Sequence, residues 1–223
     1  MFIARIFTLY PEFFPGPLAK GLYGKALVEK IWKLETVNIR DYAEDKHKTV
    51  DDTTYGGGSG MLIKPDVLAK SLDQNIKSSE KIIYLSPKGK LFNQNLAKKL
   101  AKEKTLNLIC GHFEGVDERV INSRNIEEVS IGDFVLSGGE LAATILCDSI
   151  IRLIPGVIGD ESSALSDSFQ DDLLAPPIYT RPSNYKGWKV PDVLLSGNAS
   201  MISNWREEES FKHTQERRPD LLK

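Results

Sequence analysis

The chain has 223 residues, of which 41% are hydrophobic and 27% charged, and this composition is that of an ordinary globular protein. The length allows one large domain, or one medium domain with a small one beside it. The formal net charge of −2 excludes a protein that attracts nucleic acid over its whole surface, so any RNA-binding face must be a local basic patch.

Strand-like and helix-like segments alternate through the first part of the chain. The segment from Phe2 to Leu9 predicts a first strand; it is too short for a signal peptide, and Pro11 follows it at once. Further strands are predicted at 36–40, 81–85 and 105–110, helices at 17–31, 65–76, 93–102 and 141–153, and a long polar loop at 41–60. This alternation predicts an α/β fold with a mostly parallel sheet and helices on both of its faces.

Two glycine turns stand out in this pattern. One is Cys110-Gly-His-Phe-Glu-Gly115, which follows a predicted strand. The other is Ser130-Ile-Gly-Asp-Phe-Val-Leu-Ser-Gly-Gly-Glu140, which leads directly into the predicted helix at 141–153. Glycine lets the backbone approach a ligand closely, and the start of a helix presents N–H groups without helical partners. The two turns therefore predict one shared pocket at the edge of the sheet.

Other motifs indicate neither a nucleotide-binding loop nor a metal centre. The run from Gly56 to Gly58 lacks the Lys and Ser or Thr that end a P-loop, and no Rossmann motif follows the first strand. His47 lies among mixed charges and has no partner at metal-ligand spacing, so no metal ligand is predicted. Cys110 and Cys147 have apolar neighbours and are expected to be buried thiols.

The character of the chain changes after residue 158. Residues 159–175 hold five acidic residues and no Lys or Arg, and they predict a flexible acidic linker. The linker separates a first domain, 1–158, from a small, mainly helical domain, 176–223. The longest apolar helix is interrupted by Asp148 and Arg152 and is too short to cross a bilayer. We therefore expect a cytoplasmic protein that makes no membrane contact.

Several short motifs occur in one order along the whole chain. They are Thr49-Val-Asp-Asp52 with the glycines after it, Tyr84-Leu-Ser-Pro87, the two glycine turns, Asp167-Ser-Phe169, Tyr179-Thr-Arg-Pro182, Leu194-Leu-Ser-Gly-Asn198 and Arg217-Arg-Pro219. Each motif alone is weak, but the ordered set is highly specific. In this set the chain resembles the TrmD family of bacterial tRNA (guanine-N1)-methyltransferases, which belongs to the SPOUT superfamily.

The resemblance implies a fold and a cofactor that composition does not show. The first domain would be tied in a deep trefoil knot, an exception to the rule that protein chains are unknotted. S-adenosyl-L-methionine would bind inside the knot. The residues implied to hold it are Tyr84, Leu85, Ser86, Pro87, Gly111, Phe113, Glu114, Gly115, Ser130, Ile131, Gly132, Phe134, Leu136, Gly138 and Gly139.

The resemblance also implies how the methyl group is accepted. The acceptor would be N1 of the guanine immediately 3′ of the tRNA anticodon. N1 carries a proton at neutral pH, so a base must remove it while charge develops on O6. Asp167 matches the general base of the family, and Arg152 matches the residue that stabilises the O6 charge. From the sequence alone, Asp167 would be read as a solvated linker residue and Arg152 as the partner of Asp148 on its helix.

The partners implied by the resemblance are tRNA and a second copy of the chain. In the family, each active site of an obligate homodimer joins the knot of one subunit to the linker and small domain of the other. A divalent cation such as Mg²⁺ is also implied, with Glu114 beside its place. The residues expected to contact tRNA are Asp51, Gly57, Gly58, Arg181, Lys186, Arg206, Arg217 and Arg218.

The chain departs from the usual pattern of the family at a few positions. His112 and Phe134 replace an Arg and a Tyr, Ala142 replaces a Pro, and Ala199 stands where a His is common. These changes concern tRNA affinity and the shape of the adenine pocket. Two other hypotheses stay open: a ribose 2′-O-methyltransferase of the same fold, and an RNA-binding protein that has lost catalysis.

Overall fold

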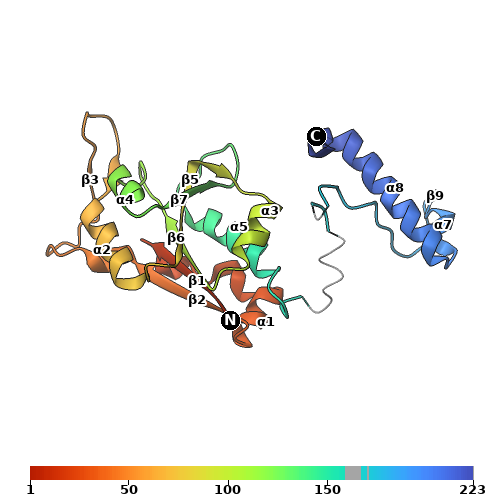
Figure 1. Cartoon of the computed structure of the whole chain (residues 1–223), viewed down its shortest axis with the longest axis horizontal. Helices are drawn as coiled ribbons and strands as arrows, with labels where there is room; N and C mark the ends of the chain where they lie inside the picture. The colour runs from red at the N-terminus through yellow and green to blue at the C-terminus, as the bar shows by residue number, and fades with distance from the viewer. Residues whose placement is uncertain (159–166, 170, 223) are drawn as a thin grey trace. The chain divides into compact units, whose positions relative to one another are not determined.

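The computed structural model of the chain describes residues 1–158, 167–169 and 171–222. The chain divides into two compact units, Met1–Gly159 and Asp160–Lys223 (Figure 1). The predicted linker falls partly on residues 159–166 and 170, which lie outside the described residues.

The first unit is built on a five-stranded sheet in the order β2-β1-β6-β5-β7, and every neighbouring pair is parallel. The strands are β1 (Phe2–Thr8), β2 (Trp32–Asn38), β5 (Lys81–Leu91), β6 (Thr105–Cys110) and β7 (Glu127–Ser130). A separate antiparallel pair is formed by β3 (Asp51–Thr53) and β4 (Met61–Ile63). The predicted α/β fold with a mostly parallel sheet is confirmed.

Helices cover both faces of this sheet, as predicted (Figure 1). One face packs against α1 (Gly21–Val28), α3 (Gln94–Leu100) and α5 (Glu140–Ile151). The other packs against α2 (Pro65–Asn75) and α4 (Glu118–Ser123). Short 3₁₀ turns lie at η1 (Pro11–Phe13), η2 (Gly16–Ala19) and η3 (Ile39–Tyr42). All six residues of β6 are buried, because helices cover both of its faces.

Some predicted elements have different bounds in the structure. The helix expected at 17–31 is divided into η2 and α1, because Lys20 is extended and Gly21 has a φ of +60°. β2 begins at Trp32, four residues before the expected strand, because its alternating charged side chains hide the strand pattern. The expected loop at 41–60 contains β3, which pairs with β4.

The strand β5 extends beyond the predicted end at Leu85 and reaches Leu91. Leu85 and Lys90 both pair with Val129, so residues 86–89 form a bulge between them. The bulge explains why Ser86 and Pro87 suggest a break in the strand although the pairing resumes after them. The helix α4 and the strand β7 are absent from the sequence prediction.

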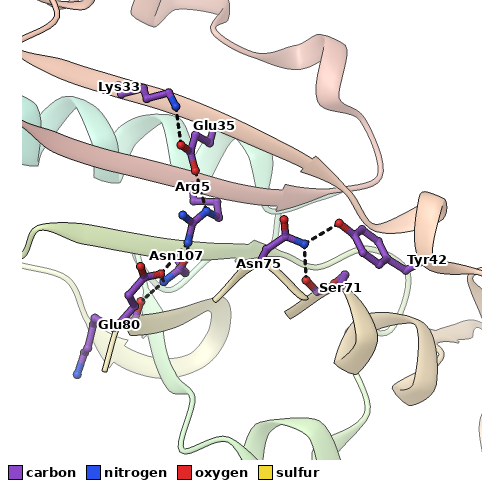
Figure 2. A network of polar contacts seen from close by, with 9 residues as sticks. Arg5, Lys33, Glu35, Tyr42, Ser71, Asn75, Glu80 and Asn107 are labelled. Carbon is purple, nitrogen blue, oxygen red and sulfur yellow. Dashed lines mark hydrogen bonds and ion pairs between the residues drawn. The ribbon is translucent and has the colours of Figure 1, made fainter. Parts of the chain in front are cut away.

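A polar network joins β1, β2 and β6 to the residue that precedes β5 (Figure 2). Arg5 donates to Glu35 (2.8 Å), to Glu80 (2.7 Å) and to Asn107 (2.9 Å). Lys33 donates to the other oxygen of Glu35 at 2.8 Å. The hydrogen bond from Lys33, followed by that from Arg5, holds the pKa of Glu35 below its ordinary value despite partial burial. Stability from this carboxylate is therefore present above the ordinary pKa of Glu and is lost as the pH falls through the lower folded value.

We expect Arg5→Met to lower the free energy of unfolding by about 3 kcal/mol, because the carboxylate of Glu80 would lose its charged partner in a poorly hydrated place. The side chains of Arg5 and Glu80 are only 13% and 14% exposed. The matched variant Lys33→Met removes a cation that is 53% exposed and should cost less than about 1 kcal/mol. Urea unfolding of both variants measures the two free energies of unfolding. Equal losses in the two variants would contradict a central role for Arg5 in the network.

The second unit consists of a small hairpin and helices. Its elements are β8 (Asn184–Tyr185), β9 (Trp188–Lys189), α7 (Asp192–Leu195), α8 (Ala199–Arg217) and the 3₁₀ turn η4 (Pro219–Leu222). The described end of the predicted linker belongs to this unit, since the N–H of Leu174 donates to Oγ1 of Thr214 on α8 at 2.9 Å. Within the described part of the chain, no helix has the length and apolarity needed to cross a membrane.

Candidate active site

A cavity of about 250 Å³ opens at the carboxyl ends of β6 and β7 and at the bulge within β5. The parallel strands bring their outgoing connections to one edge of the sheet, and α5 begins at the same place. The N–H of Gly139 donates to the carbonyl of Gly111 at 3.0 Å and joins the two glycine turns directly. The pocket predicted from these turns is therefore present in the structure.

Every residue predicted to hold the cofactor lines this cavity. The strand β5 and the bulge within it contribute Tyr84 to Pro87, the turn after β6 contributes residues 111–115, and the segment before α5 contributes residues 130–132 and 134–139. The sequence prediction omitted five lining residues, which are His112, Val129, Val135, Ser137 and Ala142. Because His112 and Ser137 lie inside the two glycine turns, the sequence could have identified them as residues of the pocket.

The glycines before α5 are required by close packing. A Cβ atom at Gly139 would lie 2.6 Å from Cα of Cys110, which is backbone and cannot move aside. A Cβ atom at Gly138 would lie 2.3 Å from the ring of His112 and 2.7 Å from the carboxylate of Glu140. Side chains here would fill the wall of the cavity, so the space for a ligand depends on these two glycines.

A buried carboxylate lies behind this wall. Glu140 is 5% exposed; it accepts a hydrogen bond from the hydroxyl of Thr8 at 2.6 Å and shares one with Nε2 of His112 at 2.8 Å. The ring of Tyr10 packs edge-on against His112, with the ring centres 4.9 Å apart. These contacts of Glu140 hold together the end of β1, the turn after β6 and the start of α5.

One group of the wall, Tyr84, and the two buried cysteines are neutral at physiological pH. Burial, and after it the charge of Glu128, raises the pKa of Tyr84 to about 12. Burial raises the pKa of the Cys110 thiol well above its ordinary value and that of Cys147 to about 12. Both cysteines are free and buried, as expected. The wall therefore offers hydrogen bonds and shape rather than a nucleophilic thiolate.

Arg152 lies at the opposite end of α5 from the cavity. Its N–H caps the helix by donating to the carbonyl of Asp148 at 3.3 Å. Burial, and after it a hydrogen bond with Asp148, raises the pKa of Tyr23 to about 12, whereas the charge of Arg152 acts in the opposite sense. The 12 residues of α5 span about 18 Å, so Arg152 does not reach the cavity of its own subunit.

Asp167 belongs to the second unit and is half-buried. In the segment that follows it, Phe169 donates its N–H to the carbonyl of Leu173 at 2.7 Å, and Arg218 lies 5.8 Å from the ring centre of Phe169. The structure therefore places Phe169, two residues after Asp167, in a turn next to the end of α8.

The residues predicted to contact tRNA fall into four places. Asp51 lies on β3, and Gly57 and Gly58 lie in the exposed connection between β3 and β4. Arg181 and Arg206 line a cavity of about 430 Å³ in the second unit, together with Tyr179 and Trp205. Lys186 lies 5.5 Å from the ring centre of Tyr185 in the turn between β8 and β9. Arg217 and Arg218 lie at the far end of α8, where Arg218 pairs with Asp220 at 2.7 Å.

The described residues contain no group of three or more His, Cys, Asp or Glu side chains that could hold a metal ion. Glu114 lies on the exposed rim of the cavity. The divalent cation implied by the resemblance stays a prediction.

Comparisons with known proteins agree with the motifs. The profile of the family described as tRNA (Guanine-1)-methyltransferase TrmD matches residues 2–223. A protein of Pelagibacter ubique named tRNA (guanine-N(1)-)-methyltransferase is 62% identical over 221 residues, which are 99% of this chain and 97% of that protein. Proteins with the same name from Bartonella henselae and Brucella canis are 53% and 51% identical over 220 residues, covering 99% of this chain and 94% and 90% of theirs.

Proposed function

The chain belongs to the TrmD family of tRNA (guanine-1)-methyltransferases, and from this premise we propose that it methylates N1 of the guanine immediately 3′ of the anticodon in tRNA. The methyl donor is S-adenosyl-L-methionine. The observation that carries this proposal is the convergence of all 15 predicted cofactor residues on one cavity in a chain that matches the family over its full length.

The cavity suits this cofactor in shape and in chemistry. Three connections surround it, and Gly138 and Gly139 add no side chains to its closely packed wall. Backbone groups of these connections can read the edge of an adenine ring, while apolar groups such as Leu85, Ile131 and Leu136 cover its faces. When bound, S-adenosylmethionine supplies a methyl group activated by its positively charged sulfur.

Two side chains of this protein carry the acid–base chemistry. Asp167 removes the proton from N1 of the guanine, which turns N1 into a nucleophile. The guanidinium of Arg152 stabilises the negative charge that then develops on O6. Because Arg cannot be deprotonated at physiological pH, it supplies a fixed positive charge without consuming the proton that Asp167 takes up.

This chemistry requires two copies of the chain. Arg152 lies about 18 Å along α5 from the cofactor cavity of its own subunit, so a second subunit must bring its charge to the reacting base. The outer face of α5 supports such an assembly, since Leu141 and Ile145 are one turn apart and are 51% and 49% exposed. A homodimer with shared active sites satisfies both observations, and sedimentation of the purified chain distinguishes it from a monomer.

The second unit is proposed to hold the tRNA. Arg181, Lys186, Arg206, Arg217 and Arg218 are all exposed there, with aromatic neighbours that suit unstacked bases. The family's trefoil knot is likewise proposed for the segment that forms the cofactor cavity, where the connection from β6 to β7 passes β5.

We expect Glu140→Gln to weaken S-adenosylmethionine binding by about 10-fold, because the amide cannot accept hydrogen bonds from both Thr8 and His112 with the strength of a carboxylate. His112 would then lose the partner that holds its ring against Gly138. Calorimetric titration with the cofactor measures the change.

The matched control for this experiment is Glu118→Gln. Glu118 also occupies the first turn of a helix, but it is exposed and lies outside the cavity. Its cofactor affinity should equal that of the wild type. An unchanged affinity in Glu140→Gln would show that the buried carboxylate does not shape the cofactor site.

The proposed function is tested by transfer of a labelled methyl group to two tRNA transcripts. One carries guanine 3′ of the anticodon and the other carries adenine at that position. Label on the first transcript alone is the expected result. Label on neither transcript, in the presence of measurable cofactor binding, would contradict the proposed RNA substrate.

A further inference from the structure

The hairpin of β3 and β4 is fastened to the wall of the cofactor cavity. The N–H of Glu114 donates to the carbonyl of Met61 at 2.9 Å, and the N–H of Ile63 donates to the carbonyl of Gly115 at 3.1 Å. Gly60 has a φ of +113°, and a Cβ atom there would lie 2.5 Å from the carboxylate of Glu114. Since Glu114 and Gly115 line the cavity, the base of the hairpin forms part of its rim.

The tip of the same hairpin presents one aromatic ring to solvent. Tyr55 is 98% exposed, and the three glycines that follow it have φ values of +86°, +80° and +119°. The connection after β3 projects from the first unit in Figure 1. Glycines give the tip no side chains of its own to cover the ring, so the ring is available to a partner.

The charges around Tyr55 favour a base over a phosphate as that partner. Asp51 and Asp52 lie on the hairpin and Glu114 lies beneath it, and these carboxylates repel the RNA backbone. Arg119 is the nearby cation, and it is paired with Asp117 at 2.7 Å. The hydrogen bond and charge of Asp117 raise the pKa of Arg119, so this cation is already engaged. A flat, uncharged nucleobase is the partner that this surface accepts.

The proposed reaction supplies such a base. A guanine whose N1 reacts in a cavity must leave the stack of the anticodon loop, and its neighbours then lose a stacking partner. We propose that Tyr55 stacks on a nucleobase that flanks the target guanine and so holds the opened loop over the cavity rim. This role rests on the proposed function and extends it to Tyr55, a residue to which the sequence motifs assigned no role.

The test combines protein and RNA variants in a double-mutant cycle. Methyl transfer is measured with wild type, Tyr55→Ala and Tyr55→Phe on intact tRNA and on tRNAs with an abasic nucleotide 5′ or 3′ of the target guanine. We expect Tyr55→Ala to lower kcat/KM for intact tRNA by about 10- to 100-fold, and Tyr55→Phe to recover most of that loss because it keeps the ring. On one of the two abasic RNAs, the wild type and Tyr55→Ala should react at the same rate.

Controls separate stacking from other causes. Cofactor affinity should be the same in all three proteins, and Val28→Ala, which truncates an apolar side chain that is 82% exposed on α1, should not change the rate. A wild-type rate in Tyr55→Ala, or an equal loss on intact and both abasic RNAs, would overturn the stacking role while leaving the proposed function intact. If the wild type transfers no methyl group, the proposed function fails. The affinity of the same proteins for the same RNAs is then measured in place of the rate, and it tests the stacking role by itself.

Discussion

Asp167→Asn is expected to bind S-adenosylmethionine as tightly as the wild type and to transfer methyl groups to tRNA about 10²- to 10⁴-fold more slowly. The amide has nearly the same shape as the carboxylate but cannot take up the proton from N1 of guanine. Asp167 does not line the cofactor cavity, so the substitution changes none of the residues that form it. Single-turnover methyl transfer and cofactor calorimetry on the same sample measure both quantities.

The matched control is Asp171→Asn, which makes the same change of charge four residues away. Asp171 is exposed, and its loss should leave the rate within about two-fold of the wild type, as is usual for surface positions. Full activity in Asp167→Asn would rule out its assignment as the base. A similar loss in both variants would instead indicate that the charge of the acidic segment matters rather than one carboxylate.

Arg152→Ala is expected to lower kcat by about 10²-fold and to change cofactor affinity little. The guanidinium is proposed to act on a charge that exists only while the guanine reacts, so its loss affects the transition state and not the bound cofactor. Arg152→Lys keeps a positive charge but not the planar donors, so its kcat should lie between those of Arg152→Ala and the wild type. Steady-state kinetics with tRNA, together with cofactor titration, separate these effects.

Arg152 also has a structural setting that this experiment must control. It caps α5 near Tyr23 and Asp148, and burial, followed by the hydrogen bond with Asp148, raises the pKa of Tyr23. Thermal unfolding of Arg152→Ala shows whether the helix end tolerates the change. Equal losses of turnover and cofactor affinity, accompanied by a lower unfolding temperature, would point to a structural role.

The cofactor cavity could be predicted because its residues form continuous motifs. Glycine turns at strand ends have a local physical meaning, and the two turns meet through the bond from Gly139 to Gly111. The parallel sheet could be predicted for a similar reason, since β6 is an uninterrupted buried run. The family inferred from the ordered motifs is confirmed by a match over residues 2–223.

Features that depend on distant contacts could not be predicted. The hydrogen bond between Thr8 and Glu140 joins residues 132 positions apart, and no local pattern indicates it. The start of β2 could not be predicted because Lys33 and Glu35 are charged and hide the strand pattern. Both belong to the network with Arg5, which forms only when the sheet is assembled. The separation of Arg152 from the cavity follows from the length of α5, whereas its proposed place at a reacting base would require a second subunit.

The measurement that tests the central claim most directly is the identity of the methylated nucleoside. tRNA with guanine 3′ of the anticodon is incubated with the protein and S-adenosylmethionine, digested to nucleosides and analysed by mass spectrometry against authentic standards. We predict N1-methylguanosine as the single new product, at one residue per tRNA. Appearance of 2′-O-methylguanosine instead, or of no methylated nucleoside while the cofactor binds, would contradict methylation at N1 of guanine.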